Sequence, residues 1–132
     1  MRFLMFKSGE KILIVDSMIT MRKLIVKICT EIGITEALEA SDASSAWDLV
    51  NTNPDSIKLV ISDWQMPQGT GIDLLKRIRS DARFQKLPFI MLSTVADPKL
   101  ISEAIKAGIS SFLVKPFTAA ALTEKISAIQ KK

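Results

Sequence analysis

Residues 12–29 read ILIVDSMITMRKLIVKIC and join two kinds of hydrophobic pattern. The first four residues form a continuous apolar run, which is typical of a strand that is buried on both faces. After Asp16 the spacing changes to every three or four residues, which predicts an amphipathic helix with an apolar face made of Met18, Met21, Ile25, Ile28 and Ile32. Ser17 is a suitable N-cap for this helix, and Gly33 is a suitable residue to end it. This stretch therefore predicts a strand that leads directly into a helix.

The same alternation continues along the rest of the chain. A weaker strand is expected near residues 35–40, and apolar runs occupy residues 59–61, 89–92 and 112–114, each followed by residues at helical spacing. Asp97 and Gly108 fit the two ends of the fourth helix, and Thr118 fits the start of the fifth. The pattern predicts an α/β fold with a doubly wound parallel sheet of five strands. We assign residues 11–131 to one domain and residues 1–10 to a short lead-in.

Length and composition limit the possible classes of protein. A chain of 132 residues with 48% hydrophobic and 24% charged residues fits a single globular domain. No apolar run approaches the roughly 20 residues that a membrane span requires, and the first six residues are too short for a signal peptide. We therefore expect a cytoplasmic protein that does not associate with membranes.

The residue inventory also limits the chemistry. The chain has no histidine, and Cys29 is its single cysteine, which we expect to be a core residue. These two facts exclude an internal disulfide, a cysteine-rich zinc site and the commonest general base. A metal site would have to use oxygen ligands, which suit Mg²⁺ or Ca²⁺.

The net charge of +4 is compatible with nucleic-acid binding, but the basic residues are dispersed. The densest group lies in residues 76–86, where it is accompanied by Asp81 and by one aromatic residue, Phe84. We interpret this group as a solvated helix face and expect no nucleic-acid partner.

Four of the five apolar runs end in a polar or charged residue: Asp16, Asp63, Ser93 and Lys115. The carboxyl ends of parallel strands share one edge of a sheet, where ligands of open α/β folds bind. If the first and third strands are neighbours, Asp16 and Asp63 stand roughly 5 Å apart. Two carboxylates that close attract a cation, and Mg²⁺ is the natural choice where oxygen ligands dominate.

Lys115 adds a positive charge at this edge, and Ser93 adds a hydroxyl donor. A carboxylate flanked by a cation, an ammonium and a hydroxyl suits phosphoryl transfer to an aspartate. A lone Asp after a strand is usually a cap or a turn residue. It is the occurrence of all four residues at strand ends that favours a functional site.

Three segments resemble the receiver domains of bacterial two-component response regulators: Ile14-Val15-Asp16, residues 62–67 with Gly69 and Gly71, and Lys115-Pro116-Phe117. The resemblance covers nearly all of residues 11–131. Residues 20–22, Trp64 and residues 117–120 look most similar to the chemotaxis-type, single-domain branch. The resemblance implies a flavodoxin-like sheet of order 2-1-3-4-5 with five helices, and this strand order is carried over from the family.

The resemblance also implies roles for individual residues. Asp63 would accept a phosphoryl group from a histidine kinase, with Lys115 and Ser93 assisting. Asp16, Asp63 and the main-chain carbonyl of Gln65 would bind Mg²⁺. Ser93 and Phe112 would form the switch that changes the surface offered to a downstream protein, for which the flagellar motor switch is a candidate. The only catalysis implied is self-phosphorylation and slow self-dephosphorylation, and the Lys115-Pro116 bond is expected to be cis.

Ser17 is the main departure from the family pattern, and Thr94 and Val95 are two smaller ones. The family usually has two adjacent acids after the first strand, and this chain has Ser17 in the second place, so weak Mg²⁺ binding is expected. The alternative function is therefore a pseudo-receiver, a protein-interaction module that works without phosphorylation. A magnesium phosphatase would need an acid at position 65, where this chain has Gln65. A dinucleotide or P-loop enzyme would need a glycine-rich turn after the first strand, and residues 16–19 contain no glycine. The sequence therefore disfavours both enzyme classes.

Overall fold

The computed structural model describes residue 6, residues 8–66 and residues 69–130. In these residues five parallel strands form one sheet in the order β2-β1-β3-β4-β5, which confirms the predicted fold. The strands are β1 (Lys11–Val15), β2 (Ala37–Ala40), β3 (Ile57–Asp63), β4 (Phe89–Ser93) and β5 (Ser111–Val114).

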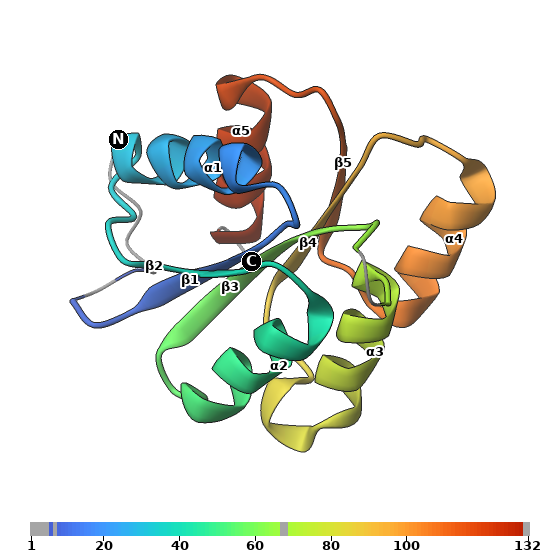
Figure 1. The fold of residues 1–132 in the computed structure, drawn as a ribbon, viewed down its shortest axis with the longest axis horizontal. Helices are drawn as coiled ribbons and strands as arrows, with labels where there is room; N and C mark the ends of the chain where they lie inside the picture. The colour runs from blue at the N-terminus through green and yellow to red at the C-terminus, as the bar shows by residue number, and fades with distance from the viewer. Residues whose placement is uncertain (1–5, 7, 67–68, 131–132) are drawn as a thin grey trace.

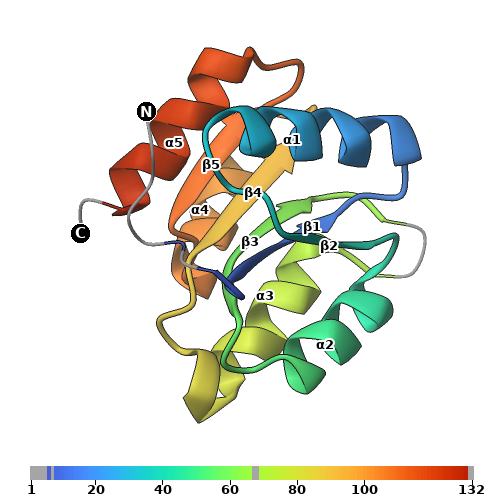
Figure 2. The ribbon, with the colours of Figure 1, turned by 90° about the vertical axis from the view of Figure 1, so that its left-hand side faces the viewer.

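Helices cover both faces of the sheet. They are α1 (Ile19–Glu31), α2 (Ala43–Thr52), α3 (Gly71–Ser80), α4 (Pro98–Ala107) and α5 (Ala119–Gln130), with a short 3₁₀ helix, η1 (Ala82–Phe84), after α3. Figure 1 shows α1 and α5 on one face and α2, α3 and α4 on the other. Figure 2, turned by 90°, shows the strands between these two helical layers.

The strand β1 explains why the apolar runs are continuous. Ile12 and Ile14 belong to the core beneath α1 and α5, whereas Leu13 and Val15 belong to the core beneath α2 and α3. Each is at most 1% exposed, because a strand covered on both faces has no polar side. Cys29 also lies in the first of these cores, and burial raises the pKa of its thiol to about 12, which confirms it as an inert core residue.

Most predicted helix ends are confirmed. The Asp97 carboxylate accepts a hydrogen bond from the Lys99 N–H at 2.9 Å, and Gly108 ends α4 with a φ of 100°. The Thr118 hydroxyl accepts a hydrogen bond from the Ala121 N–H at 3.0 Å. Side-chain acceptors and one left-handed glycine thus set the ends of α4 and the start of α5.

The predicted N-cap of α1 is wrong. The helix begins at Ile19, and its N-cap is Met18, which makes no side-chain capping bond. The Asp16 carboxylate accepts a hydrogen bond from the Met18 N–H at 2.9 Å and so forms the turn that Ser17 was expected to form. Ser17 is left exposed, one residue before the N-cap.

The basic group in residues 76–86 is only partly a solvated face. Arg79 is partly buried and donates to the carbonyls of Gly108 and Phe84 at 2.8–3.1 Å. Arg77 and Arg83 each lie 4.6 Å from the centre of an aromatic ring. These arginines therefore have partners within the chain, and the interpretation as a solvated face was wrong for Arg79.

Some predictions fall on residues outside the described part. Of the lead-in, only Phe6 and residues 8–10 are described, and Phe6 packs against the core beneath α1 and α5. Pro67 of the turn after β3 and Lys131 at the predicted domain end lie outside the described residues. Within residues 8–66 and 69–130, none of the helices has the length and apolar character needed to cross a bilayer.

Candidate functional site

An open cleft of about 600 Å³ lies at the carboxyl ends of the central strands. Its lining residues come from the turns after β1, β3, β4 and β5: Ser17, Met18, Asp63, Trp64, Gln65, Ser93, Thr94 and Lys115. The strand ends that the sequence analysis selected are therefore brought to one place, as the parallel arrangement requires.

Lys115 connects the two carboxylates of the site. Its Nζ lies 2.8 Å from Oδ2 of Asp16 and 3.1 Å from Oδ1 of Asp63. The exposed fractions of the three side chains are 9% for Lys115, 1% for Asp16 and 13% for Asp63. One ammonium thus offsets part of the repulsion between two carboxylates that share a largely buried edge. Asp63 is the more exposed of the two acids and the one that lines the cleft.

Burial raises the pKa of the Asp63 carboxyl above its ordinary value, and the neighbouring charge of Lys115 opposes this shift. The Asp16 carboxylate, also near Asp63, adds to the rise. The site therefore holds Asp63 as a partly desolvated carboxylate next to a fixed positive charge, which is a suitable setting for a nucleophile.

The backbone around Asp63 is fixed on both sides. Asp63 pairs with Leu92 of β4, and the Trp64 N–H donates to the Leu92 carbonyl at 2.7 Å. The Gly71 N–H donates to the Trp64 carbonyl at 2.8 Å, which ties the start of α3 to the end of β3. Gly71 also approaches the Asp63 main chain closely, a constraint that the sequence analysis missed.

Ser93 ends β4 and is 2% exposed. Its Oγ accepts a hydrogen bond from the Val95 N–H at 3.0 Å. Since a hydroxyl can accept and donate at once, its hydrogen remains a donor for an anionic oxygen.

The donor set of the site suits Mg²⁺. It offers the carboxylates of Asp16 and Asp63, and Gln65 lines the same cleft, compatible with the predicted use of its carbonyl. In the described part of the chain, no three His, Cys, Asp or Glu side chains gather into a metal-binding group. The weak Mg²⁺ binding expected from Ser17 stays a prediction.

Phe112 lies away from the cleft. It pairs with Met91 across the sheet and is partly buried against the core that includes Met91 and Ala104 of α4. It thus lies on the α4 side of β5, where a change of its rotamer would alter the packing against α4. Its role as a switch residue stays a prediction. The Lys115-Pro116 bond is cis, as expected.

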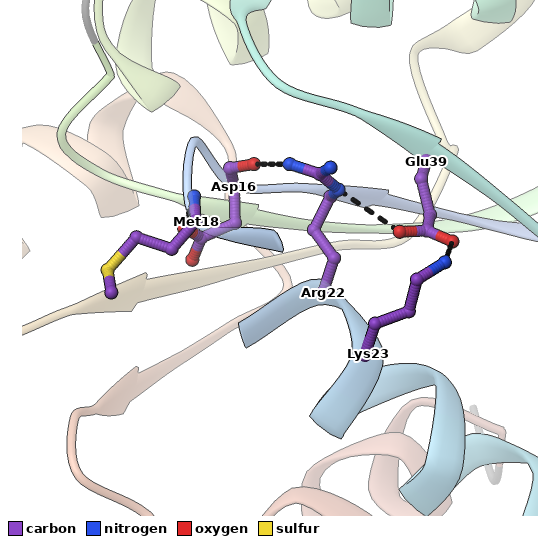
Figure 3. Close-up of polar contacts among 5 residues, drawn as sticks. All are labelled: Asp16, Met18, Arg22, Lys23 and Glu39. Atoms are coloured by element: carbon purple, nitrogen blue, oxygen red, sulfur yellow. Dashed lines mark hydrogen bonds and ion pairs between the residues drawn. The ribbon is translucent and has the colours of Figure 1, made fainter. Parts of the chain in front are cut away.

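The sequence analysis did not select Arg22, which the structure places beside the site. Its guanidinium donates to the main-chain carbonyl of Asp16 at 2.7 Å and to the carboxylate of Glu39 at 3.0 Å (Figure 3). The acceptor at Asp16 is main chain, so residue types alone could not identify this contact. The available signals were the resemblance of residues 20–22 to the chemotaxis-type branch and the place of Arg22 one turn into the helix that follows Asp16.

Comparison with known proteins agrees with this geometry. The family model of the response regulator receiver domain matches residues 12–127. The chain belongs to this family. The chain is similar to chemotaxis protein CheY1 of Helicobacter pylori, with 40% identity over 90% of this chain and 95% of the relative. It is also similar to chemotaxis protein CheY of Pseudomonas aeruginosa, with 41% identity over 90% of this chain and 94% of the relative.

Solved structures show the same architecture. Chemotaxis protein CheY4 of Vibrio cholerae matches with a TM-score of 0.83 and 28% identity, over 91% of this chain and 98% of that chain. A chain of the CheX–CheY–BeF₃–Mg²⁺ complex of Borrelia burgdorferi matches with a TM-score of 0.85 and 25% identity, over 91% of this chain and 88% of that chain. The receiver fold and the relation to chemotaxis proteins thus rest on sequence and structure together.

Proposed function

We propose that this receiver is a single-domain response regulator that accepts a phosphoryl group on Asp63 from a histidine kinase. The observation that carries the proposal is the contact of Lys115 with both Asp16 and Asp63. This contact places a fixed cation beside the one acid of the site that lines the cleft.

In the proposed reaction, a carboxylate oxygen of Asp63 forms a bond to phosphorus, and the P–N bond of the phosphohistidine breaks. The bonding electrons leave with the imidazole nitrogen of the kinase, which is protonated on release. Lys115 would offset the negative charge on the phosphoryl oxygens, and Ser93 would donate its hydroxyl hydrogen to one of them. Asp63 must be ionised to attack, so phosphorylation should weaken at acidic pH.

Asp16, Asp63 and the Gln65 main-chain carbonyl would hold Mg²⁺. When bound, Mg²⁺ supplies further charge compensation for the phosphoryl oxygens.

The relatives that are most informative here are chemotaxis proteins. We therefore place the output of this receiver in chemotaxis, through phosphorylation-dependent binding to a protein such as a component of the flagellar motor switch. Movement of Ser93 toward the phosphoryl group and inward rotation of Phe112 would change the surface near α4 and β5.

The second candidate function is a pseudo-receiver that binds proteins without phosphorylation. The presence of Ser17 on the cleft, in place of an acid, is the observation that favours it. The two functions differ in whether Asp63 takes up a phosphoryl group.

The test is incubation of the full chain with phosphoramidate or acetyl phosphate and Mg²⁺, followed by measurement of the intact mass. The proposal predicts the gain of one phosphoryl group in the wild type and no gain in Asp63→Asn. A wild-type chain that gains no mass would favour the pseudo-receiver. A mass gain that persists in Asp63→Asn would refute Asp63 as the acceptor.

A further inference from the structure

The turn between β1 and α1 carries Asp16, Ser17 and Met18 to the edge of the cleft. The first turn of α1 holds no acidic residue, and the N-cap Met18 offers no side-chain acceptor. The usual devices that fix the start of a helix are therefore missing where the chain enters the site. The Asp16 carboxylate, which accepts from the Met18 N–H at 2.9 Å, holds the turn from one side, and further contacts come from α1.

Arg22 supplies two such contacts. Its main-chain N–H donates to the Met18 carbonyl at 3.1 Å, which closes the first turn of the helix. Its guanidinium extends back to the main-chain carbonyl of Asp16 at 2.7 Å (Figure 3). The turn is thus held from the main chain and from a side chain of the same residue.

Glu39 of β2 fixes the other side of the guanidinium. Its carboxylate accepts from Nε of Arg22 at 3.0 Å and from Nζ of Lys23 at 2.7 Å. Hydrogen bonding by Lys23 and, to a smaller extent, by Arg22 lowers the pKa of Glu39 and keeps it ionised. Arg22 is 15% exposed and bonds both Asp16 and Glu39, whereas Lys23 is 62% exposed and its ammonium bonds Glu39.

We propose that Arg22 is a positioning residue for the phosphorylation site, because it holds the Asp16 main chain and so aims the Asp16 carboxylate at Lys115. The path has three measured steps: Arg22 to the Asp16 carbonyl at 2.7 Å, Asp16 Oδ2 to Lys115 at 2.8 Å, and Lys115 to Asp63 at 3.1 Å. This inference rests on the proposed function, since it concerns the same acceptor.

The absence of a second acid makes this positioning more important. With Ser17 neutral, Asp16 alone must orient Lys115 from the end of β1. The planar guanidinium can donate to the Asp16 carbonyl and to Glu39 at the same time, whereas a lysine ammonium at the same place is a flexible point charge. Loss of the two directed hydrogen bonds of the guanidinium, rather than loss of its charge, should therefore lower the phosphorylation rate.

The experiment compares Arg22→Ala, Arg22→Lys and Lys23→Ala in the full chain. Lys23→Ala is the matched control, because it also removes a cation from Glu39 but leaves the contact with Asp16 intact. The phosphorylation rate is measured from intact mass over a series of phosphoramidate concentrations, and the melting temperature is measured for each variant. Mg²⁺ is titrated separately by the fluorescence of Trp64, with Trp47→Phe in every chain to remove the second tryptophan.

We expect Arg22→Ala to lower the maximal rate about tenfold, equivalent to about 1.4 kcal/mol, with little change in the half-saturating phosphoramidate concentration. The Mg²⁺ midpoint should rise, and Arg22→Lys should restore neither value. Lys23→Ala should stay within about twofold of the wild type in both. A purely structural role would lower the melting temperature without separating Arg22 from Lys23.

Each other result has a definite meaning. A wild-type chain that takes up no phosphoryl group would overturn the proposed function itself. Wild-type phosphorylation with an equal rate in Arg22→Ala would overturn only the role of Arg22. Equal losses in Arg22→Ala and Lys23→Ala, or full recovery in Arg22→Lys, would also overturn it. If Arg22→Ala does not fold, the comparison of Arg22→Lys with Lys23→Ala decides the question in the same way.

Discussion

Gly71 packs so closely against Asp63 that a Cβ on Gly71 would lie 2.5 Å from the Asp63 carbonyl oxygen. The same atom would lie 2.6 Å from Sδ of Met91. The methionine can shift, but the carbonyl belongs to β3 and is held in the sheet. A glycine is therefore required where α3 starts beneath the proposed acceptor.

The first prediction is that Gly71→Ala destabilises the fold by about 1–3 kcal/mol, as overpacking of a tight interior does. Because the strain falls on the Asp63 main chain, the phosphorylation rate should fall as well. Urea denaturation and intact-mass kinetics measure the two effects. A variant with wild-type stability and rate would show that the main chain of β3 yields easily at this point.

The strand ends were predictable because an apolar run that is buried on both faces stops abruptly at its first polar residue. This simple signal located Asp16, Asp63, Ser93 and Lys115. The start of β3 was less clear, since Lys58 interrupts its apolar run. The strand begins at Ile57, which pairs with Lys11 of β1, and the partly exposed Lys58 that follows lies 4.0 Å from Glu10.

Contacts with main-chain atoms were not predictable. The bond from Arg22 to the Asp16 carbonyl depends on the helical phase of α1, and the approach of Gly71 to Asp63 depends on where α3 enters. The error at Ser17 has a related cause, because the Asp16 carboxylate accepts from the Met18 N–H and the helix begins one residue later than expected, with Met18 as its N-cap. Residue propensity alone does not predict which of the two neighbouring side chains bonds to the main chain.

The second prediction concerns Ser17, which lines the cleft and carries no charge. Ser17→Asp adds a carboxylate near the proposed Mg²⁺ ligands, so Mg²⁺ should bind about tenfold more tightly, corresponding to about 1.4 kcal/mol. The measurement is an Mg²⁺ titration of Trp64 fluorescence in a Trp47→Phe background.

Ser44→Asp is the control for Ser17→Asp, because it adds the same charge at an exposed position of α2, away from the cleft. It should leave the titration unchanged. An unchanged or weaker midpoint in Ser17→Asp would count against the assigned metal site.

The third prediction uses the raised pKa of Asp63, which burial causes and Lys115 opposes. The folded-state pKa of Asp63 is higher than its ordinary value of 3.8, so the unfolded state loses this proton first as the pH rises. The free energy of unfolding therefore falls until the pH exceeds the folded-state pKa. Asp63→Asn removes that loss of stability. Its melting temperature relative to the wild type should therefore rise as the pH increases from 3.8 through the raised folded-state pKa.

Asp48→Asn is a suitable control for Asp63→Asn, since Asp48 is exposed on α2. The difference between this control and the wild type should not follow the same trend. A gain for Asp63→Asn that shrinks as pH rises would contradict the assigned direction.

The last prediction concerns the output of the switch. Phe112 is partly buried on the α4 side of β5 and does not line the cleft, so Phe112→Ala should leave phosphorylation of Asp63 intact. Movement of Ser93 toward the phosphoryl group would leave space that the ring can fill, and full burial of a phenylalanine side chain contributes about 1.5–3 kcal/mol. Loss of the ring should therefore reduce the phosphorylation-dependent gain in affinity for the proposed flagellar switch partner by about tenfold to a hundredfold.

Thr94 is exposed on the cleft next to Ser93. In the proposed switch, its bulk would restrict the inward rotation of Phe112. Thr94→Ala should therefore raise the same gain in affinity that Phe112→Ala lowers. Binding of the phosphorylated and unphosphorylated forms of each variant, measured by titration calorimetry, separates the gain from the basal affinity. Since Phe112 has no hydroxyl to pair, the ring can act only through packing, and Phe112→Leu should recover part of the loss. Equal gains in the wild type and in Phe112→Ala would mean that Phe112 is a buried strand residue with no part in the output.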